Sequence, residues 1–182
     1  MVCVDATFLG LMLHPTARPP HDPVTNKPTE RVKDRIEKLL EDLDAARERV
    51  IVPTPALCEF LVLAKGDGPQ YLSEIGNLSN FYIRPFDQMA AIELAAMELL
   101  ARATGSKRAP ESSEAPWQKV KFDRQIVAIS KVHSAHTIFS DDRHIRTFAE
   151  DVGIKVVSCW ELDLPVSKTP LLDNASEPPL EL

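Results

Sequence analysis

The sequence predicts an α/β fold with three layers, in which helices cover both faces of a central, mainly parallel sheet. Short apolar runs alternate along the chain with longer segments of helical periodicity, which is typical of parallel strands joined by helices. The clearest unit spans residues 122–157, where a helix ending at Val132 leads into the predicted strand Thr137–Ser140. A second helix from Arg143 and the strand Ile154–Val157 complete a βαβ unit.

Length and composition indicate one globular domain. The chain has 182 residues, of which 44% are hydrophobic and 26% are charged, and both fractions are ordinary for a globular protein. No apolar run approaches the roughly 20 residues of a membrane-spanning helix. Three cysteines without a CxxC pair indicate reduced, mostly buried thiols in a cytoplasmic protein and disfavour a zinc site.

The predicted domain spans residues 1–158 and contains two long polar loops. The first, residues 14–28, holds five of the fifteen prolines and has no periodicity. The second, residues 104–116, is rich in Ser, Gly and Pro. The acidic, proline-containing segment 159–182 is predicted to be a poorly ordered tail.

Periodicity and turn residues predict the other elements in chain order. The apolar run Val2–Val4 suits a strand buried on both faces, and the first strand of such a sheet tends to be central. The Ala- and Leu-rich helix 88–103 is predicted to pack in the core. The remaining predicted elements are an amphipathic helix at 29–49, a strand at 50–53, a helix from Thr54, a short helix at 70–78 and a strand at 81–86.

Carboxylates lie at or near the ends of several predicted strands. Asp5 closes the first strand, Glu59 is the one acid in an otherwise apolar helix, and Asp141 and Asp142 follow a later strand. Asp123 lies at the start of its predicted helix. Because parallel strands end at one edge of a sheet, where ligands bind, these acids are expected to meet. Mg²⁺ and Mn²⁺ prefer such carboxylate oxygens.

Each acid also has a purely structural interpretation. Asp5 and either residue of the pair Asp141 and Asp142 are well placed to cap the helices that follow them. Glu59 can instead interact with the dipole of its own helix. The net charge of −6 does not favour a broad nucleic-acid-binding face. The residues alone therefore leave helix capping and metal binding open.

Four acidic motifs follow one another along the chain: VDAT at 4–7, PTPALCE at 53–59, FDRQIVAI at 122–129 and IFSDDRHI at 138–145. In this order they resemble the acidic motifs of PIN-domain nucleases, a family that includes the ribonuclease toxins of bacterial toxin–antitoxin pairs. The resemblance covers residues 2–157. It implies a PIN-like fold and an endoribonuclease that uses Mg²⁺ or Mn²⁺ to hydrolyse phosphodiester bonds of single-stranded RNA.

The resemblance also implies the site residues. The catalytic and metal-binding acids are Asp5, Glu59, Asp123 and Asp142, with Asp141 as a further candidate ligand. The assisting hydroxyls are Thr7 and Ser140, and the candidate phosphate contacts are Arg124, Arg143, Lys107 and Arg108. His144 stands where many members have another acid, which leaves one or two metal ions open.

The resemblance implies an RNA substrate, an antitoxin as a candidate partner and a homodimer as a candidate assembly. The lack of a long apolar run predicts no membrane association. Two other hypotheses remain. One is a PIN-like module with weak or no catalysis that binds RNA or protein. The other is a phosphatase or receiver-type domain with Asp5 as nucleophile, although the chain has no DxDx[TV] motif.

Overall fold

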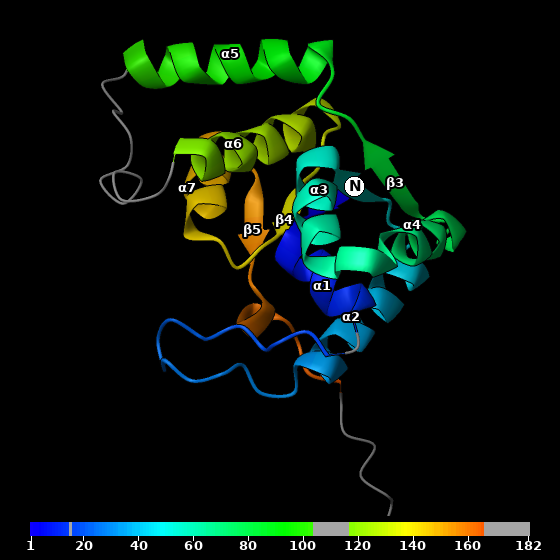
Figure 1. The fold of residues 1–182 in the computed structure, drawn as a ribbon. Coiled ribbons are helices and arrows are strands. Elements are labelled where there is room, and N and C mark those ends of the chain that lie inside the picture. Colours follow the sequence, from blue (N-terminus) through cyan, green and yellow to red (C-terminus); the bar gives the residue numbers. More distant parts are fainter. Residues whose placement is uncertain (15, 104–116, 166–182) are drawn as a thin grey trace, which may run out of the picture.

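The structure, a computed structural model, describes residues 1–14, 16–103 and 117–165. Within these residues five parallel strands form one sheet in the order β3-β2-β1-β4-β5, with β1 in the centre (Figure 1). The strands are β1 (Val2–Val4), β2 (Val50–Pro53), β3 (Phe81–Arg84), β4 (Thr137–Phe139) and β5 (Lys155–Val157). The predicted α/β class, the parallel sheet and the central first strand are confirmed.

Helices connect the strands and cover both faces of the sheet (Figure 1). Because every strand pair is parallel, the connecting helices return against the strand direction, and those that directly follow a strand begin at its carboxyl end. The helices are α1 (Ala6–Leu13), α2 (Val32–Ala45), α3 (Thr54–Ala64), α4 (Gly68–Asn77), α5 (Gln88–Ala103), α6 (Trp117–Val132) and α7 (Arg143–Asp151), with 3-10 turns η1 (Lys65–Asp67) and η3 (Cys159–Glu161).

Alternation along the strands divides the core into two halves. On β1, Val2 and Val4 belong to the apolar cluster that also contains residues of α1 to α4, whereas Cys3 belongs to the cluster with α6 and α7. Ile51 and Ile138, the partners of Cys3 on β2 and β4, lie in the same cluster as Cys3. The period of two in a strand thus gives the central strands an apolar side chain for each face.

The amphipathic helix predicted at 29–49 is shorter in the structure. Arg31 has φ of 53°, in the left-handed region, so the helix begins only at Val32. Arg47 has φ of 51° beyond the other end. The predicted solvent-facing charge pairs are present, since Lys38 binds Asp42 across one turn at 2.8 Å.

The prediction that helix 88–103 packs in the core is wrong. Helix α5 lies outside α6 (Figure 1), and Ala90 is its one residue with a buried side chain among those described. Met89, Ile92 and Leu99 are each more than half exposed. Composition could not reveal this, because Ala and Leu suit an exposed helix as well as a buried one.

The domain extends past its predicted boundary at residue 158. Turn η3 follows β5 directly, and Cys159 and Leu162 are buried in the core cluster with Val2 and Val4. Residues 159–162 are therefore not part of a poorly ordered tail, and the rest of the predicted tail, from residue 166, lies outside the described part of the chain, as does the predicted loop 104–116. Loop 14–28 carries one isolated bridge, His21 to Pro28.

The thiols and the helices agree in part with the sequence analysis. All three cysteines are free, with Cys3 and Cys159 buried as expected but Cys58 exposed. In the described residues, no helix combines the length and the apolar character needed to cross a bilayer.

Two glycines allow a test of the positive φ angle at Gly153. Gly153 has φ of +78°, which strains any residue with a Cβ, whereas Gly76 lies in α4 with open space where a Cβ would project. Gly153→Ala is expected to lower the free energy of unfolding by about 1 kcal/mol, and Gly76→Ala is expected to leave it unchanged or raise it. Urea unfolding of both variants measures the difference. Equal effects would contradict the assigned turn.

Candidate functional site

The carboxyl ends of β1 and β4 bring Asp5 beside Ser140. Val4 pairs with Phe139 in register, and the Asp5 amide donates to the Phe139 carbonyl at 3.2 Å. The next residue on each strand is therefore held at the same edge of the sheet. There the Ser140 hydroxyl donates to Asp5 Oδ2 at 2.5 Å, and both side chains are buried.

The same hydroxyl also holds Asp142. Ser140 Oγ accepts a hydrogen bond from the Asp142 amide at 3.0 Å while its proton goes to Asp5. A hydroxyl can donate once and accept twice, so one side chain fixes two acidic residues relative to each other. The structure thus brings together Asp5, Ser140 and Asp142, although Asp5 and Ser140 lie 135 residues apart in the chain.

The capping interpretation of these acids is confirmed. Asp5 Oδ1 accepts from the Phe8 amide at 2.8 Å at the start of α1. Asp142 Oδ1 accepts from the His144 amide at 2.7 Å at the start of α7. Capping does not exclude a functional role, because each cap uses one carboxylate oxygen and holds the carboxyl group at a helix N-terminus.

Asp141 is directed elsewhere. Its Oδ1 accepts from the Cys159 amide at 2.7 Å in η3, and its Oδ2 is buried with no hydrogen-bond partner in the described residues. Burial raises the pKa of Asp141 to about 6, against the lowering effect of the Cys159 amide. Asp142 is therefore the better placed of the two neighbouring acids to act with Asp5.

Asp5 is a buried acid in an acidic neighbourhood. Burial raises its pKa to about 7; hydrogen bonds from the Phe8 amide and Ser140 hydroxyl lower the pKa, while the charges of Asp141 and Asp142 raise it further. A carboxyl group with this pKa releases its proton readily near neutral pH when a cation approaches.

Glu59 and Asp123 lie on the two helices that flank this edge. Glu59 is half-buried on α3, which packs on α1, and Asp123 is buried on the first half of α6, which packs on α3. No group of three or more His, Cys, Asp or Glu side chains within residues 1–14, 16–103 and 117–165 is close enough to bind one ion. The convergence of all four acids on a metal therefore stays a prediction.

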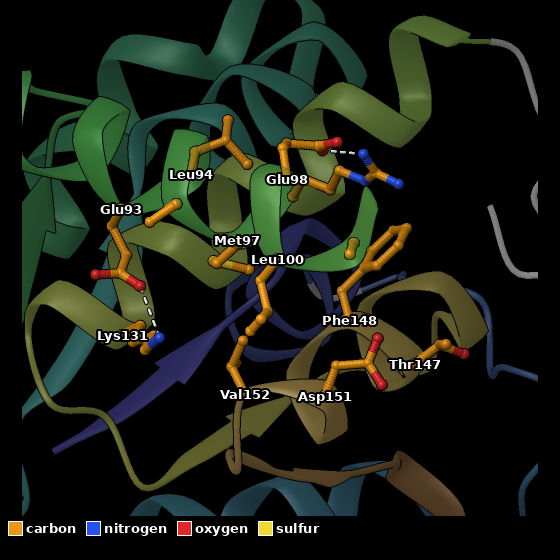
Figure 2. A pocket seen from close by; sticks show the side chains of 13 residues that line it. Glu93, Leu94, Met97, Glu98, Leu100, Lys131, Thr147, Phe148, Asp151 and Val152 are labelled. Atoms are coloured by element: carbon orange, nitrogen blue, oxygen red, sulfur yellow. Dashed lines mark hydrogen bonds and ion pairs between the residues drawn. The ribbon is translucent and has the colours of Figure 1, made fainter. Parts of the chain in front are cut away.

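The predicted phosphate contacts have different positions. Arg124 does not lie free at the site, because it is paired with Glu98 of α5 and stacks on the Phe148 ring at 4.5 Å. Arg124, Glu98 and Phe148 line a pocket of about 530 Å³ between α5, α6 and α7 (Figure 2). Arg143 is exposed at the first residue of α7, and Lys107 and Arg108 lie outside the described residues.

The donors that the structure brings together suit a hard cation. Asp5, Ser140 and Asp142 offer oxygen atoms only, which Mg²⁺ and Mn²⁺ prefer. The raised pKa of buried Asp5 gives a second reason, since a bound divalent ion would stabilise the charged carboxylate. Thr7, the other predicted hydroxyl, is exposed on the first turn of α1.

Comparison with solved structures finds chains from two VapBC complexes. One is DNA-bound VapBC from Salmonella typhimurium, with 14% identity, a TM-score of 0.49, and coverage of 87% of this chain and 97% of that chain. The other is VapBC2 from Rickettsia felis bound to a DNA fragment from their promoter, with 14% identity, a TM-score of 0.52, and coverage of 87% and 98%.

The chain has a PIN-like fold. The second similarity and the five-stranded parallel sheet carry this conclusion, and they confirm the fold that the four motifs implied. No family model and no curated protein matches the sequence. At 14% identity the likeness extends to the PIN-like architecture and no further.

Sequence reasoning missed the residues after β5 that hold the turn 140–142. Ser158 and Glu161 form a capping box around η3, and Arg146 donates to both of their side chains. The spacing Ser158-x-x-Glu161 is a capping-box signature that the sequence contains. It lay at the predicted domain boundary, where a disordered tail was expected instead.

The raised pKa of Asp5 predicts how stability depends on pH in metal-free protein. Between about pH 4 and 7 native Asp5 holds a proton that the unfolded chain has released, because an unperturbed Asp has a pKa near 3.9. Its contribution is complete below about pH 4 and is lost as pH rises through 7. Wild type should therefore gain stability over Asp5→Asn on acidification from pH 8 to 5, by at most about 1.4 kcal/mol per pH unit.

Urea unfolding of both proteins in EDTA at the two pH values checks this. The comparison with Asp5→Asn removes the contributions of the other titrating groups, which both proteins share. A constant difference between wild type and Asp5→Asn across the range would show that Asp5 titrates normally.

Proposed function

We propose that this protein is a divalent-metal-dependent endoribonuclease that hydrolyses phosphodiester bonds of single-stranded RNA. The observation that carries the proposal is the hydrogen-bonded group of Asp5, Ser140 and Asp142 at the carboxyl edge of a PIN-like fold. The acidic motifs of the sequence and the fold support the same class of activity from independent directions.

Asp5 and Asp142 would hold the ion, which is Mg²⁺ or Mn²⁺. When bound, such an ion lowers the pKa of water and stabilises charge on the phosphate. Ser140 holds the Asp5 carboxyl group and the Asp142 backbone amide in place, and the His144 amide holds the Asp142 carboxyl group, so that little rearrangement accompanies binding. Burial of Asp5 excludes bulk water from one side of the site.

Glu59 and Asp123 complete the proposed ligand set. Glu59 lies on α3, which packs on α1, and Asp123 lies on α6, which packs on α3. A change of side-chain rotamer is a small motion compared with the movement of a helix. Thr7 is exposed in the first turn of α1, two residues after the capping Asp5, where it could assist at the substrate side. Arg143, also exposed, directly follows Asp142 and could contact a phosphate.

We also propose an antitoxin protein as partner, which would make the chain the toxin of a pair. The structural neighbour with the higher TM-score comes from a VapBC complex. Helix α5 supports a protein partner independently, because Met89, Ile92, Leu99 and Leu100 expose apolar surface that monomeric proteins seldom leave open. A homodimer is the other candidate to cover it, and sedimentation of the purified chain alone separates the two.

A PIN-like binding module with little or no catalysis is the second candidate function. The observation that favours it is that the described acids do not include three close enough to hold one ion. Such a module would bind RNA or protein without cleaving it, and Mn²⁺ would not change its melting temperature.

Removal of a proposed ligand tests the activity. Asp5→Asn and Asp142→Asn are each expected to reduce Mn²⁺-dependent cleavage of a labelled single-stranded RNA by more than about 100-fold, which corresponds to about 2.7 kcal/mol of transition-state stabilisation. Asp141→Asn should lose less, since its side chain binds the Cys159 amide. Glu41→Gln, which changes an exposed acid of α2, is the matched control, and this variant should cleave RNA as wild type does.

Cleavage that survives in both Asp5→Asn and Asp142→Asn would reject the proposed site. RNA binding without cleavage by the wild type, in Mg²⁺ or Mn²⁺, would support the binding module instead.

A further inference from the structure

The turn that carries Ser140 and Asp142 is also held by the last residue of β5 and the residue that follows it. The Ser140 amide donates to the Val157 carbonyl at 3.0 Å, and the Ser158 hydroxyl donates to the Ser140 carbonyl at 3.0 Å. Ser158 is buried. The backbone of Ser140 is thus fixed by two hydrogen bonds from a segment that contains none of the proposed ligands.

The hydroxyl of Ser158 is itself oriented by charged groups. Arg146 donates to Ser158 Oγ at 2.8 Å and to Glu161 Oε2 at 2.5 Å. The same Glu161 oxygen accepts from the Ser158 amide at 2.7 Å. Because Arg146 can only donate, Ser158 Oγ must accept from it, and its own proton is directed to Ser140. Arg146 therefore orients the Ser158 hydroxyl, which donates to the Ser140 carbonyl, and the separate hydroxyl of Ser140 donates to Asp5.

A parallel link fixes the middle of the turn. Asp141 accepts from the Cys159 amide, so three consecutive residues, 140 to 142, each have a hydrogen bond that sets their position. This link also keeps the Asp141 carboxyl group directed at η3, away from its neighbour Asp142.

Turn η3 is anchored in the body of the domain. Cys159 and Leu162 are buried in the core, and Arg35 of α2 donates to the carbonyls of Leu162 and Trp160. A buried and charge-assisted anchor resists displacement better than an exposed loop does. The segment 158–161 can thus act as a rigid support for residues 140–142.

We infer that Ser158, Glu161 and Arg146 are positioning residues that set Ser140, and through it Asp5 and Asp142, in the geometry that binds a divalent ion. The inference rests on the proposed function for the ion, but the hydrogen bonds that it invokes can be tested without activity. Partners that orient the groups around a metal typically change its affinity when they are removed, although they never touch it.

The alternative is that the capping box only stabilises the end of the domain. Ser130 supplies the matched control, because its buried hydroxyl also donates to a backbone carbonyl, that of Ile126 at 2.8 Å, within α6. Ser158→Ala and Ser130→Ala each delete one buried hydroxyl. If the role of Ser158 is purely structural, each variant should differ from wild type only in melting temperature.

The test uses the full chain and three measurements: Mn²⁺ affinity by calorimetry, exchange of the Asp142 backbone amide by NMR without metal, and melting temperature. Ser158→Ala is expected to weaken Mn²⁺ binding about 10-fold and to speed Asp142 exchange, because that amide donates to Ser140 Oγ. Ser130→Ala should lower the melting temperature only.

Glu161 gives a second pair of variants on a more exposed side chain, which keeps the test open if Ser158→Ala does not fold. Glu161→Ala is expected to act in the same direction as Ser158→Ala. Glu161→Gln should recover most of the affinity, because its amide oxygen can still accept from Ser158 and Arg146.

Wild-type Mn²⁺ affinity and Asp142 exchange in Ser158→Ala or Glu161→Ala would overturn the inference. A wild type that binds no Mn²⁺ and cleaves no RNA, with faster Asp142 exchange in Ser158→Ala, would reject the proposed function and leave the support of the turn in place.

Discussion

One hydroxyl connects two segments that are distant in the sequence, at the acidic edge of the sheet. Ser140 lies between β4 and α7, and its hydroxyl donates to Asp5 at the end of β1 while it accepts from the Asp142 amide. Without this bridge the Asp5 carboxyl group and the backbone of Asp142, which follow neighbouring strands, would lose their direct link. The parallel pairing of β1 and β4 places the groups, and Ser140 joins them.

The electrostatics of this edge follow from burial. Asp5 caps α1 from inside the domain, so its carboxyl group loses water that hydrogen bonds from Phe8 and Ser140 only partly replace. The rise of the Asp5 pKa to about 7 reflects that imbalance. A buried carboxyl group of this kind lowers the stability of the domain, and acids with a strongly shifted pKa are frequent at functional sites.

Helix α5 has ion pairs to α6 and exposed apolar side chains. Two ion pairs join helix α5 to α6, Glu93 with Lys131 and Glu98 with Arg124 (Figure 2). These pairs occupy the described charges of α5 and leave its outer face apolar. The chemistry at the sheet edge and the apolar surface on α5 therefore lie on separate elements, so a protein could cover α5 without touching Asp5.

The sequence by itself determined the class of fold and the central β1, because short buried strands leave strong local patterns, and it predicted that acids following those strands meet at one edge of the sheet, as Asp5 and Asp142 do. Only the tertiary structure decided that Asp141 turns toward η3, that Arg124 is used by Glu98, and that α5 is exposed. Each of these depends on a partner distant in the chain, and periodicity carries no information about which residues become neighbours across a fold.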